Sequence, residues 1–365
     1  MKHALKTRKQ LQQQLEQAHD YEHWCEAATA LDDMDGLLDW REQEETGMLH
    51  ESLMRKHMGL MDHCRQNGDT RRLIRILQES LYRHLGELSY PDLYTVARSG
   101  TNRLVGEFLD AVETSMEFIC DHPIPEVTTA RKLKMFQDAE RVYGRPALML
   151  SGGAAFGIYH IGVTRALWRQ DLLPDVMAGS SMGAIVAGAI CTRNDKELAE
   201  FFNHPERIHL NAFHWLGVTE GLRAGHAMDP RQLQEHLQHN LGSVSFKEAY
   251  EHSGRTLNIS VSPTRTQQKP RPLIEQAYAM TSQQYLGDIN IHFPPRASLY
   301  RKVLSNPTPE DLEMYINLGE QATWPRLAMI KDQTRISRAF DRCIARLEQE
   351  LEQEQETAEQ TATPL

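Results

Sequence analysis

The stretch Gly179-Ser180-Ser181-Met182-Gly183 decides the fold of the central part of this chain. It follows the short, mostly apolar run 175–178 and precedes 184–190, a run of small and aliphatic residues. A strand, a tight turn and a helix are the context that a G-x-S-x-G nucleophile elbow requires. The glycines let strand and helix approach closely, and the helix N-terminus presents unpaired N–H groups to a developing anion. The pattern therefore predicts a Ser181 hydroxyl lifted off the end of a strand.

A predicted βαβ unit contains this elbow. The apolar residues 147–150 predict a buried strand, and 151–157, Ser-Gly-Gly-Ala-Ala-Phe-Gly, predict a tight turn directly after it. Residues 158–169 have the composition of a helix, and 175–180 predict the next strand. The length suits two parallel strands joined by a crossover helix. Because both strands then end at the same edge of the sheet, we expect the glycine turn beside the elbow.

The glycine turn supplies free backbone N–H groups near the Ser181 hydroxyl. We expect these donors to be those of Gly152, Gly153 and Ala154. An oxyanion hole beside a nucleophile is the arrangement that acyl transfer requires. A P-loop is disfavoured because Ile158-Tyr159 stand where Lys-Ser/Thr is needed, and the G-x-G-x-x-G dinucleotide spacing is absent. The alternative that the glycines only permit a tight βα turn stays open.

A glycine-rich oxyanion loop, one helix and then G-x-S-x-G resemble the patatin-like phospholipase family. The branch it resembles is that of the triacylglycerol lipases, which carry a helical domain in front of the patatin domain. The resemblance implies a three-layer α/β fold, no cofactor, and hydrolysis of acyl-lipid esters by a Ser–Asp dyad. It spans nearly the whole chain and includes Tyr21-Glu22-His23-Trp24, Arg83-His84-Leu85-Gly86, Gly100-Thr101-Asn102, Leu257-Asn258-Ile259-Ser260-Val261, Gly287-Asp288-Ile289 and the segment 332–338.

The glycine-rich loop departs from the family pattern G-G-G-x-R/K-G at two positions. Ala154 replaces the third glycine, which is a mild change because the contact is made by a backbone N–H. Phe156 replaces the basic residue, which removes a charge and leaves an apolar side chain. The second change suits a neutral ester better than an anionic head group.

The dyad aspartate of the family lies in D-G-G, D-G-A or D-G-S downstream of the serine, and no Asp-Gly pair follows Ser181 here. Asp35-Gly36 lies in the N-terminal helical region and fits a helix cap or turn. Asp175, Asp229 and Asp288 do not match the family motif, and Asp229 before Pro230 reads as a helix N-cap. We therefore assign no general base, and without one Ser181 is a poor nucleophile at neutral pH.

The missing aspartate coincides with a short sheet. We expect core strands at 147–150, 175–180 and 257–261, with 289–293 as a doubtful fourth, whereas a doubly wound sheet has about five or six strands. The chain passes from 257–261 through a Pro-rich stretch to a helix at 273–286, where the family places the rest of its sheet. The α/β core is therefore expected to lack a segment near residues 271–272.

Histidines offer other bases in principle, and a Ser–His–acid triad stays open. His160 lies early in the helix after the glycine loop, where packing is the simpler interpretation. His204, His209 and His214 are spaced by five residues, which matches neither an i, i+4 ligand pair nor H-E-x-x-H. We read these three as surface or loop residues and expect no metal site.

Composition agrees with a globular enzyme and excludes other classes. The net charge of −10 argues against nucleic acid as the main partner. The five scattered cysteines form no C-x-x-C, so we expect reduced thiols and a cytoplasmic protein. We see no signal peptide and no apolar run of transmembrane length. An acyl-lipid substrate would then be met peripherally, at a membrane or droplet surface, and the oligomeric state is not predicted.

The chain divides by composition into four regions. Residues 1–145 predict a helical domain, 146–271 the patatin-like α/β core, and 272–350 a C-terminal helical region. Thr308-Pro309 is a helix start with Thr308 as N-cap. Residues 351–365 are rich in Glu, Gln and Thr and predict a disordered tail.

Three functions remain open. The first is a serine lipid acyl hydrolase acting on triacylglycerol or phospholipid esters through Ser181. The second is a catalytically impaired, shortened relative that binds lipid or regulates. The third is a helical interaction protein whose α/β part is a scaffold.

Overall fold

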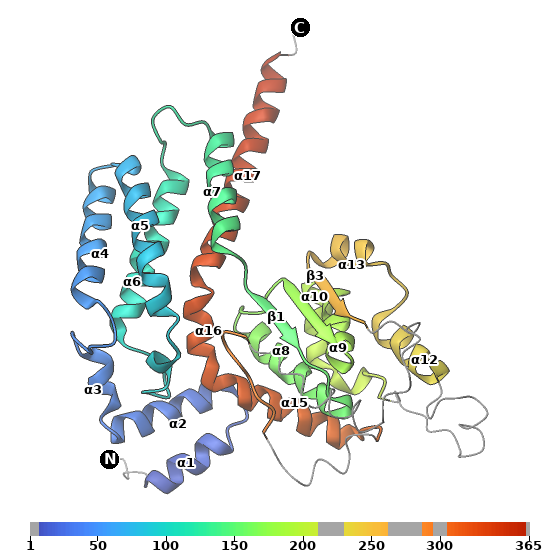
Figure 1. The fold of residues 1–365 in the computed structure, drawn as a ribbon. Helices are drawn as coiled ribbons and strands as arrows, with labels where there is room; N and C mark the ends of the chain where they lie inside the picture. The colour runs from blue at the N-terminus through green and yellow to red at the C-terminus, as the bar shows by residue number, and fades with distance from the viewer. Residues whose placement is uncertain (1–6, 211–229, 262–286, 295–304, 363–365) are drawn as a thin grey trace, which may run out of the picture. The chain divides into compact units, whose positions relative to one another are not determined.

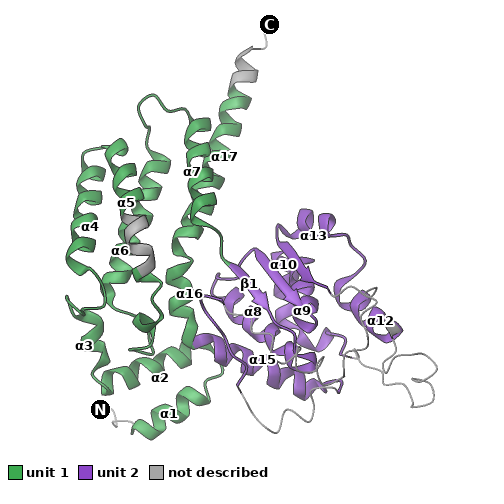
Figure 2. Ribbon diagram, in the orientation of Figure 1, with its two compact units in different colours: residues 1–146, 325–365 green, residues 147–324 purple. Residues whose placement is uncertain are grey.

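The structure is a computed structural model that describes residues 7–210, 230–261, 287–294 and 305–362 (Figure 1). The chain divides into two compact units (Figure 2). Unit 1 comprises residues 1–146 and 325–365, and unit 2 comprises residues 147–324. The sequence places the boundaries of its C-terminal regions elsewhere, at 271 and 350, because it follows composition, whereas the units follow contacts.

In its described residues, unit 1 consists of helices joined by loops and contains no strand. Its elements are α1 (Arg8–Glu16), α2 (Tyr21–Met34), α3 (Leu37–Glu42), α4 (Glu51–Gln66), α5 (Thr70–Leu88), the 3₁₀ turn η1 (Pro91–Tyr94), α6 (Arg103–Asp121), α7 (Thr129–Tyr143), η5 (Trp324–Arg326) at the boundary between the units, α16 (Leu327–Gln333) and α17 (Arg335–Ala362).

The helices of unit 1 begin where short polar side chains can cap them. The side chains of Thr7, Asp20, Asn102 and Thr128 accept hydrogen bonds from N–H groups in the first turns of α1, α2, α6 and α7. α17 packs against both α6 and α7, although more than 190 positions separate it from either helix in the chain. The core between them contains the T-shaped ring pair Phe136 and Phe340, with ring centroids 6.3 Å apart.

A buried carboxylate fixes the loop that leads into α6. Asp32 on α2 is fully buried and accepts hydrogen bonds from the backbone N–H groups of Arg98 and Ser99 and from their side chains. Arg41 on α3 donates to the Ser99 hydroxyl and to the Thr101 carbonyl. The buried charge is thereby paired with a cation and fully hydrogen-bonded, which is what burial requires.

Unit 2 is an α/β unit with helices and a small sheet. Its described elements are β1 (Ala147–Leu150), η2 (Ala154–Ile158), α8 (Tyr159–Arg169), β2 (Val176–Ser180), α9 (Met182–Cys191), α10 (Asp195–Asn203), η3 (Pro205–Arg207), α12 (Pro230–Leu241), α13 (Phe246–Ser253), β3 (Thr256–Ser260) and α15 (Pro309–Thr323).

The sheet is parallel and has the strand order β1-β2-β3 in the described residues. In its register Leu150 pairs with Gly179, and Gly179 pairs with Ile259. α9 packs against all three strands through its buried small and aliphatic residues. The βαβ unit and the α/β fold class predicted from the sequence are confirmed.

The α8 and α15 helices cross at two glycines. A Cβ atom on Gly162 would lie 1.9 Å from the Ile316 carbonyl oxygen, and one on Gly319 would lie 2.2 Å from the Tyr159 carbonyl oxygen. Next to the crossing, the buried Glu320 accepts two hydrogen bonds from Arg165 and one from Arg169. Residues near the C-terminal part of the chain thus complete the α/β unit.

Other details differ from the sequence predictions. Residues 289–293 contain no strand, so the doubtful fourth strand is not present there. The structure continues α17 to Ala362, whereas the sequence predicts disorder from residue 351; Glu, Gln and Ala are strong helix formers, which explains the difference. The helix predicted at 273–286 and the cap predicted at Asp229 lie outside the described residues.

Candidate active site

Ser181 lies at the sharp turn between β2 and α9. Its backbone angles are φ 52° and ψ −125°, a conformation that costs energy for any residue with a side chain. Its carbonyl oxygen accepts hydrogen bonds from the N–H groups of Ala184 (3.0 Å) and Ile185 (3.2 Å), which start the helix. The Ser181 residue is exposed, while its neighbours Met182 and Gly183 are buried. A strained turn that exposes a serine at a helix N-terminus is the geometry of a nucleophile elbow.

Two glycines make this turn sterically possible. A Cβ atom on Gly179 would lie 2.5 Å from the Gly183 carbonyl oxygen, and one on Gly183 would lie 2.2 Å from the Leu150 carbonyl oxygen. Any side chain at either position would collide with backbone. The structure thus shows the close approach of strand and helix that the sequence predicts for these two residues.

The glycine-rich loop after β1 lies against the serine. A Cβ atom on Gly152 would stand 3.2 Å from the Ser181 Cβ atom. Among the described residues, the backbone N–H groups of Gly152, Gly153 and Ala154 find no hydrogen-bond acceptor. Free N–H groups next to a hydroxyl can bind the oxyanion that forms during acyl transfer. Ala154 adopts φ 47°, a left-handed conformation that glycine adopts more easily.

An aromatic cluster anchors the loop. The Phe156 ring stacks on Phe293 with ring centroids 4.9 Å apart, and it meets Tyr315 of α15 edge-on at 6.1 Å. Tyr159 meets Phe293 at 5.3 Å. The apolar residue that replaces the family's basic one therefore packs inside unit 2. Sequence reasoning missed this contact because Phe293 and Tyr315 are distant in the chain and carry no local signal.

Comparison with protein families identifies both parts of the chain. Residues 148–315 match the model of the patatin-like phospholipase family, and residues 1–141 match a domain of unknown function, DUF3336. The chain carries a patatin-like phospholipase domain. This domain contains the elbow and the glycine-rich loop described above, which confirms the resemblance inferred from the sequence.

The relatives of the chain are lipases. It is 29% identical over 287 residues to triacylglycerol lipase 5 of Saccharomyces cerevisiae, covering 74% of this chain and 38% of the relative. It is 34% identical over 268 residues to triacylglycerol lipase ptl2 of Schizosaccharomyces pombe, covering 72% and 42%. It is 33% identical over 258 residues to triacylglycerol lipase SDP1L of Arabidopsis thaliana, covering 69% and 31%. The chain thus spans less than half the length of these three relatives, and no solved structure matches it.

His160 of the patatin-like domain supports the loop. Its Nε2 atom lies 2.9 Å from the Ser151 carbonyl oxygen and 3.5 Å from the Ser151 hydroxyl. Burial lowers the pKa of His160, and the hydrogen bond to the Ser151 carbonyl offsets part of that effect. A neutral ring that donates to Ser151 holds the start of the glycine-rich loop. Within the described residues, no hydrogen bond joins His160 to Ser181.

The aspartates rejected from the sequence remain outside the site. Asp35 lies in unit 1, where it caps α2 and pairs with Arg98. Asp175 precedes β2, at the end of the strand opposite Ser181, and its carbonyl accepts from Thr256 N–H. Asp288 is exposed, and Asp229 lies outside the described residues. Within the described part of the chain, no carboxylate or imidazole hydrogen-bonds the Ser181 hydroxyl.

His204 and His209, two of the three histidines spaced by five residues, have different partners. His209 lies beside His236 and His239 of α12, with ring centroids 5.7 and 5.1 Å away, while His204 contacts Glu206 at the surface. His214 lies outside the described residues. In the described residues, the three groups close enough to ligate one ion are His19, Asp20 and His23, within 4.8 Å of one another in unit 1. Asp20 there already caps α2 and bonds the His23 ring.

Proposed function

We propose that this protein is a serine lipid acyl hydrolase that cleaves acyl esters of triacylglycerol or phospholipid. The observation that carries the proposal is Ser181, exposed on a strained elbow with Gly152 of the glycine-rich loop against it. Within the described residues, the N–H groups of Gly152, Gly153 and Ala154 in that loop have no acceptor and could bind the oxyanion. The family match and the lipase relatives support the same reaction class. The N-terminal end of α9 adds a positive dipole at the place where negative charge would form.

The reaction follows from this arrangement. The Ser181 oxygen attacks the ester carbonyl carbon, its proton passes to a base, and the loop N–H groups stabilise the oxyanion. The bond from that carbon to the alcohol oxygen breaks, and the alcohol leaves with a proton. Water then cleaves the acyl-enzyme, which releases the fatty acid and restores the Ser181 hydroxyl. We assign the base to no residue.

The test is labelling with a fluorophosphonate followed by ester hydrolysis. We expect the wild-type protein to be labelled and to cleave a medium-chain p-nitrophenyl ester and emulsified triacylglycerol, and Ser181→Ala to do neither. Ser180→Ala is the matched control, because it removes the adjacent hydroxyl and leaves the elbow serine in place. A folded wild-type protein that is neither labelled nor active contradicts the proposal.

A second function is supported by the unassigned base. Because no described carboxylate or imidazole hydrogen-bonds Ser181, we also propose a catalytically impaired lipid-binding relative. If this second function is right, we expect the Ser181→Ala protein to bind lipid vesicles as tightly as wild type, and neither protein to hydrolyse ester. The absence of any lipid binding by the folded protein would exclude it.

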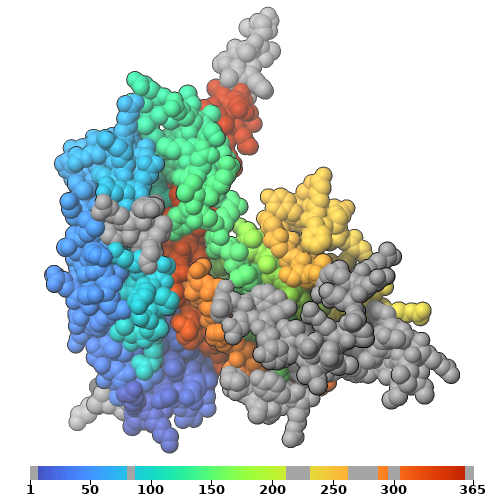
Figure 3. Space-filling view, viewed as in Figure 1, coloured from blue at the N-terminus to red at the C-terminus, as the bar shows by residue number. Residues whose placement is uncertain are grey.

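Contact with lipid at a surface is supported by exposed apolar side chains on unit 2. Phe246 and Tyr250 of α13 are 61% and 55% exposed, and their i, i+4 spacing places them on one face of the helix. α13, yellow in the space-filling view, lies at the surface (Figure 3). Among the described helices, none is long and apolar enough to cross a bilayer. We propose peripheral contact through α13.

A further inference from the structure

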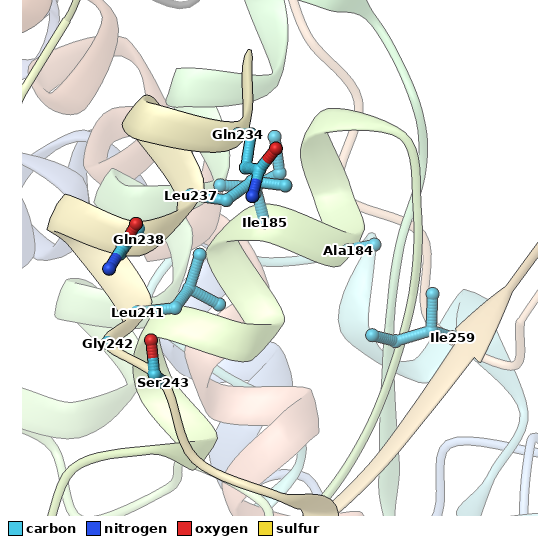
Figure 4. Close-up of a pocket in the computed structure, with 9 residues that line it drawn as sticks. All are labelled: Ala184, Ile185, Gln234, Leu237, Gln238, Leu241, Gly242, Ser243 and Ile259. Atoms are coloured by element: carbon cyan, nitrogen blue, oxygen red, sulfur yellow. The ribbon is translucent and has the colours of Figure 1, made fainter. Parts of the chain in front are cut away.

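A cavity of about 600 Å³ lies between α9, α12 and β3 of unit 2 (Figure 4). Ile185 of α9 lies beside Leu237 of α12, and Ala184 lies on the side of α9 towards Ile259 of β3. Leu241 of α12 closes the cavity against α9. The volume falls within the roughly 300–1,000 Å³ of small-molecule sites.

Part of the cavity wall lies within one helical turn of the candidate nucleophile, although Ser181 itself is not among the described lining residues. Ala184 and Ile185 are the residues whose N–H groups donate to the Ser181 carbonyl, so they form the first turn of the helix that starts at Ser181. With a rise of about 1.5 Å per residue, this turn lies about 5–6 Å along the helix from Ser181. On the other wall, Ile259 pairs in register with Gly179, two residues before the serine. The walls on α9 and β3 thus lie next to the elbow, and α12 supplies the remaining wall.

The far wall is held rigidly on α9. A Cβ atom on Gly188 would lie 2.2 Å from the Leu241 side chain, so the glycine leaves room for that leucine. Arg193, just after α9, donates a 2.8 Å hydrogen bond to the Asn240 carbonyl at the end of α12. These two contacts fix the distance between the helices and therefore the width of the cavity.

The lining selects an apolar, uncharged occupant. Among the described residues that line this cavity none is charged, and the polar ones are the neutral amides of Gln234 and Gln238 and the hydroxyl of Ser243. A hydrocarbon chain that enters the cavity leaves water and covers the aliphatic side chains of Ile185, Leu237 and Ile259. Both changes remove apolar surface from water and therefore favour binding.

We propose that this cavity binds the hydrocarbon chain of the acyl group whose ester carbonyl is attacked by Ser181. The proposal rests on the proposed hydrolase function and adds where the acyl chain lies and which residues sense its length. Leu237 sets the depth from α12, and Ile185 and Ile259 form the walls nearest the serine.

The test compares the labelling rates of Ser181 by fluorophosphonates with a short and a dodecyl chain. We expect wild type to react faster with the dodecyl probe, and Leu237→Trp to lose this preference on the order of tenfold while its short-probe rate stays the same. Leu233→Trp is the matched control, because Leu233 lies on α12 but does not line the cavity. An unchanged chain-length preference in Leu237→Trp overturns the proposal.

A second measurement separates this proposal from the hydrolase function. If neither probe labels the folded wild-type protein, the hydrolase function is contradicted. Binding of the fluorescent fatty acid cis-parinaric acid to the Ser181→Ala protein then tests whether the cavity holds an acyl chain. We then expect Leu237→Trp in that background to weaken binding on the order of tenfold and Leu233→Trp to leave it unchanged. Equal binding by all three proteins overturns the proposal.

Discussion

Gly162 of α8 and Gly319 of α15 meet so closely that a Cβ atom on Gly319 would stand 2.9 Å from the Gly162 Cα atom. The same atom would lie 2.2 Å from the Tyr159 carbonyl, at the start of the helix that follows the glycine-rich loop. α15 therefore rests directly on the backbone of α8. This contact joins residues more than 150 positions apart and lies where the glycine-rich loop ends and α8 begins.

Alanine at this crossing should separate the two helices. We expect Gly162→Ala and Gly319→Ala each to lower the free energy of unfolding by about 3 kcal/mol, because the new methyl group collides with backbone rather than with a movable side chain. Urea unfolding measures this. Gly59→Ala in α4 is the control: nothing lies within 4 Å of its Cβ position, so we expect about 0.5–1 kcal/mol of stabilisation.

Glu320 should be the critical member of its ion-pair group. Its side chain is 3% exposed and accepts from Arg165 and Arg169, whose side chains are 11% and 43% exposed. Glu320→Gln leaves the buried Arg165 uncompensated, so we expect a loss of about 3–5 kcal/mol in unfolding free energy. Arg169→Gln removes only the exposed partner and should cost at most about 1 kcal/mol. Equal losses in the two variants would contradict this assignment.

Replacing Ala154 by glycine should stabilise the folded protein. Its φ of 47° costs an alanine roughly 1–2 kcal/mol, while glycine adds about 0.5–1 kcal/mol of chain entropy in the unfolded state. We therefore expect Ala154→Gly to raise the unfolding free energy by about 0.5 kcal/mol. Ala155→Gly, next to it, is buried and does not have a positive φ, so it should destabilise by about 1 kcal/mol. A thermal-unfolding comparison of the two variants gives the sign of each effect.

His236 should make stability fall in mild acid. Burial, followed by the nearby His209 and His239, lowers its pKa to about 4 from an ordinary 6.5. Between these two pH values the unfolded chain binds the extra proton and the folded protein does not, so the stability present above pH 6.5 is lost as the pH falls. We expect wild type to lose on the order of 1 kcal/mol more than His236→Phe between pH 7 and pH 5, after solvent screening. Parallel urea midpoints for the two proteins at both pH values would show that His236 does not contribute.

A negative charge on α13 should lower activity on a lipid surface without lowering activity on a soluble ester. We expect Phe246→Glu to lower hydrolysis of emulsified triacylglycerol at least several-fold, because the charge resists insertion among lipids. Hydrolysis of a soluble p-nitrophenyl ester should stay unchanged, since α13 contributes no residue to the elbow or the loop. Lys247→Glu, at an exposed position of the same helix, is the control for added negative charge.

Much of the local architecture could be predicted because it depends on residues close in the chain. The strand at 147–150 is present, but only Leu150 of it is buried, so the prediction of a buried strand is wrong. The helix start at Thr308-Pro309 is found as predicted, since caps and proline act within a few residues. The same holds for the elbow: Gly179 and Gly183 flank Ser181 at the G-x-S-x-G spacing, and a side chain at either glycine would collide with backbone. Parallel pairing then follows, because a βαβ unit brings both strand ends to one edge.

The tertiary structure decided what depends on distant residues. Phe156 replaces a basic residue in the sequence pattern, but only the fold shows it stacked on Phe293 and edge-on to Tyr315. In the sequence, Gly162 and Gly319 are two glycines within predicted helices, where glycine is unfavourable. The structure shows that both are needed where the two helices cross. The cavity beside Ser181 joins α9, α12 and β3, which no short-range pattern connects. Local chemistry determines helices, strands and turns, whereas packing between segments far apart in the chain determines the shape of a site, because each contact depends on where both partners fold.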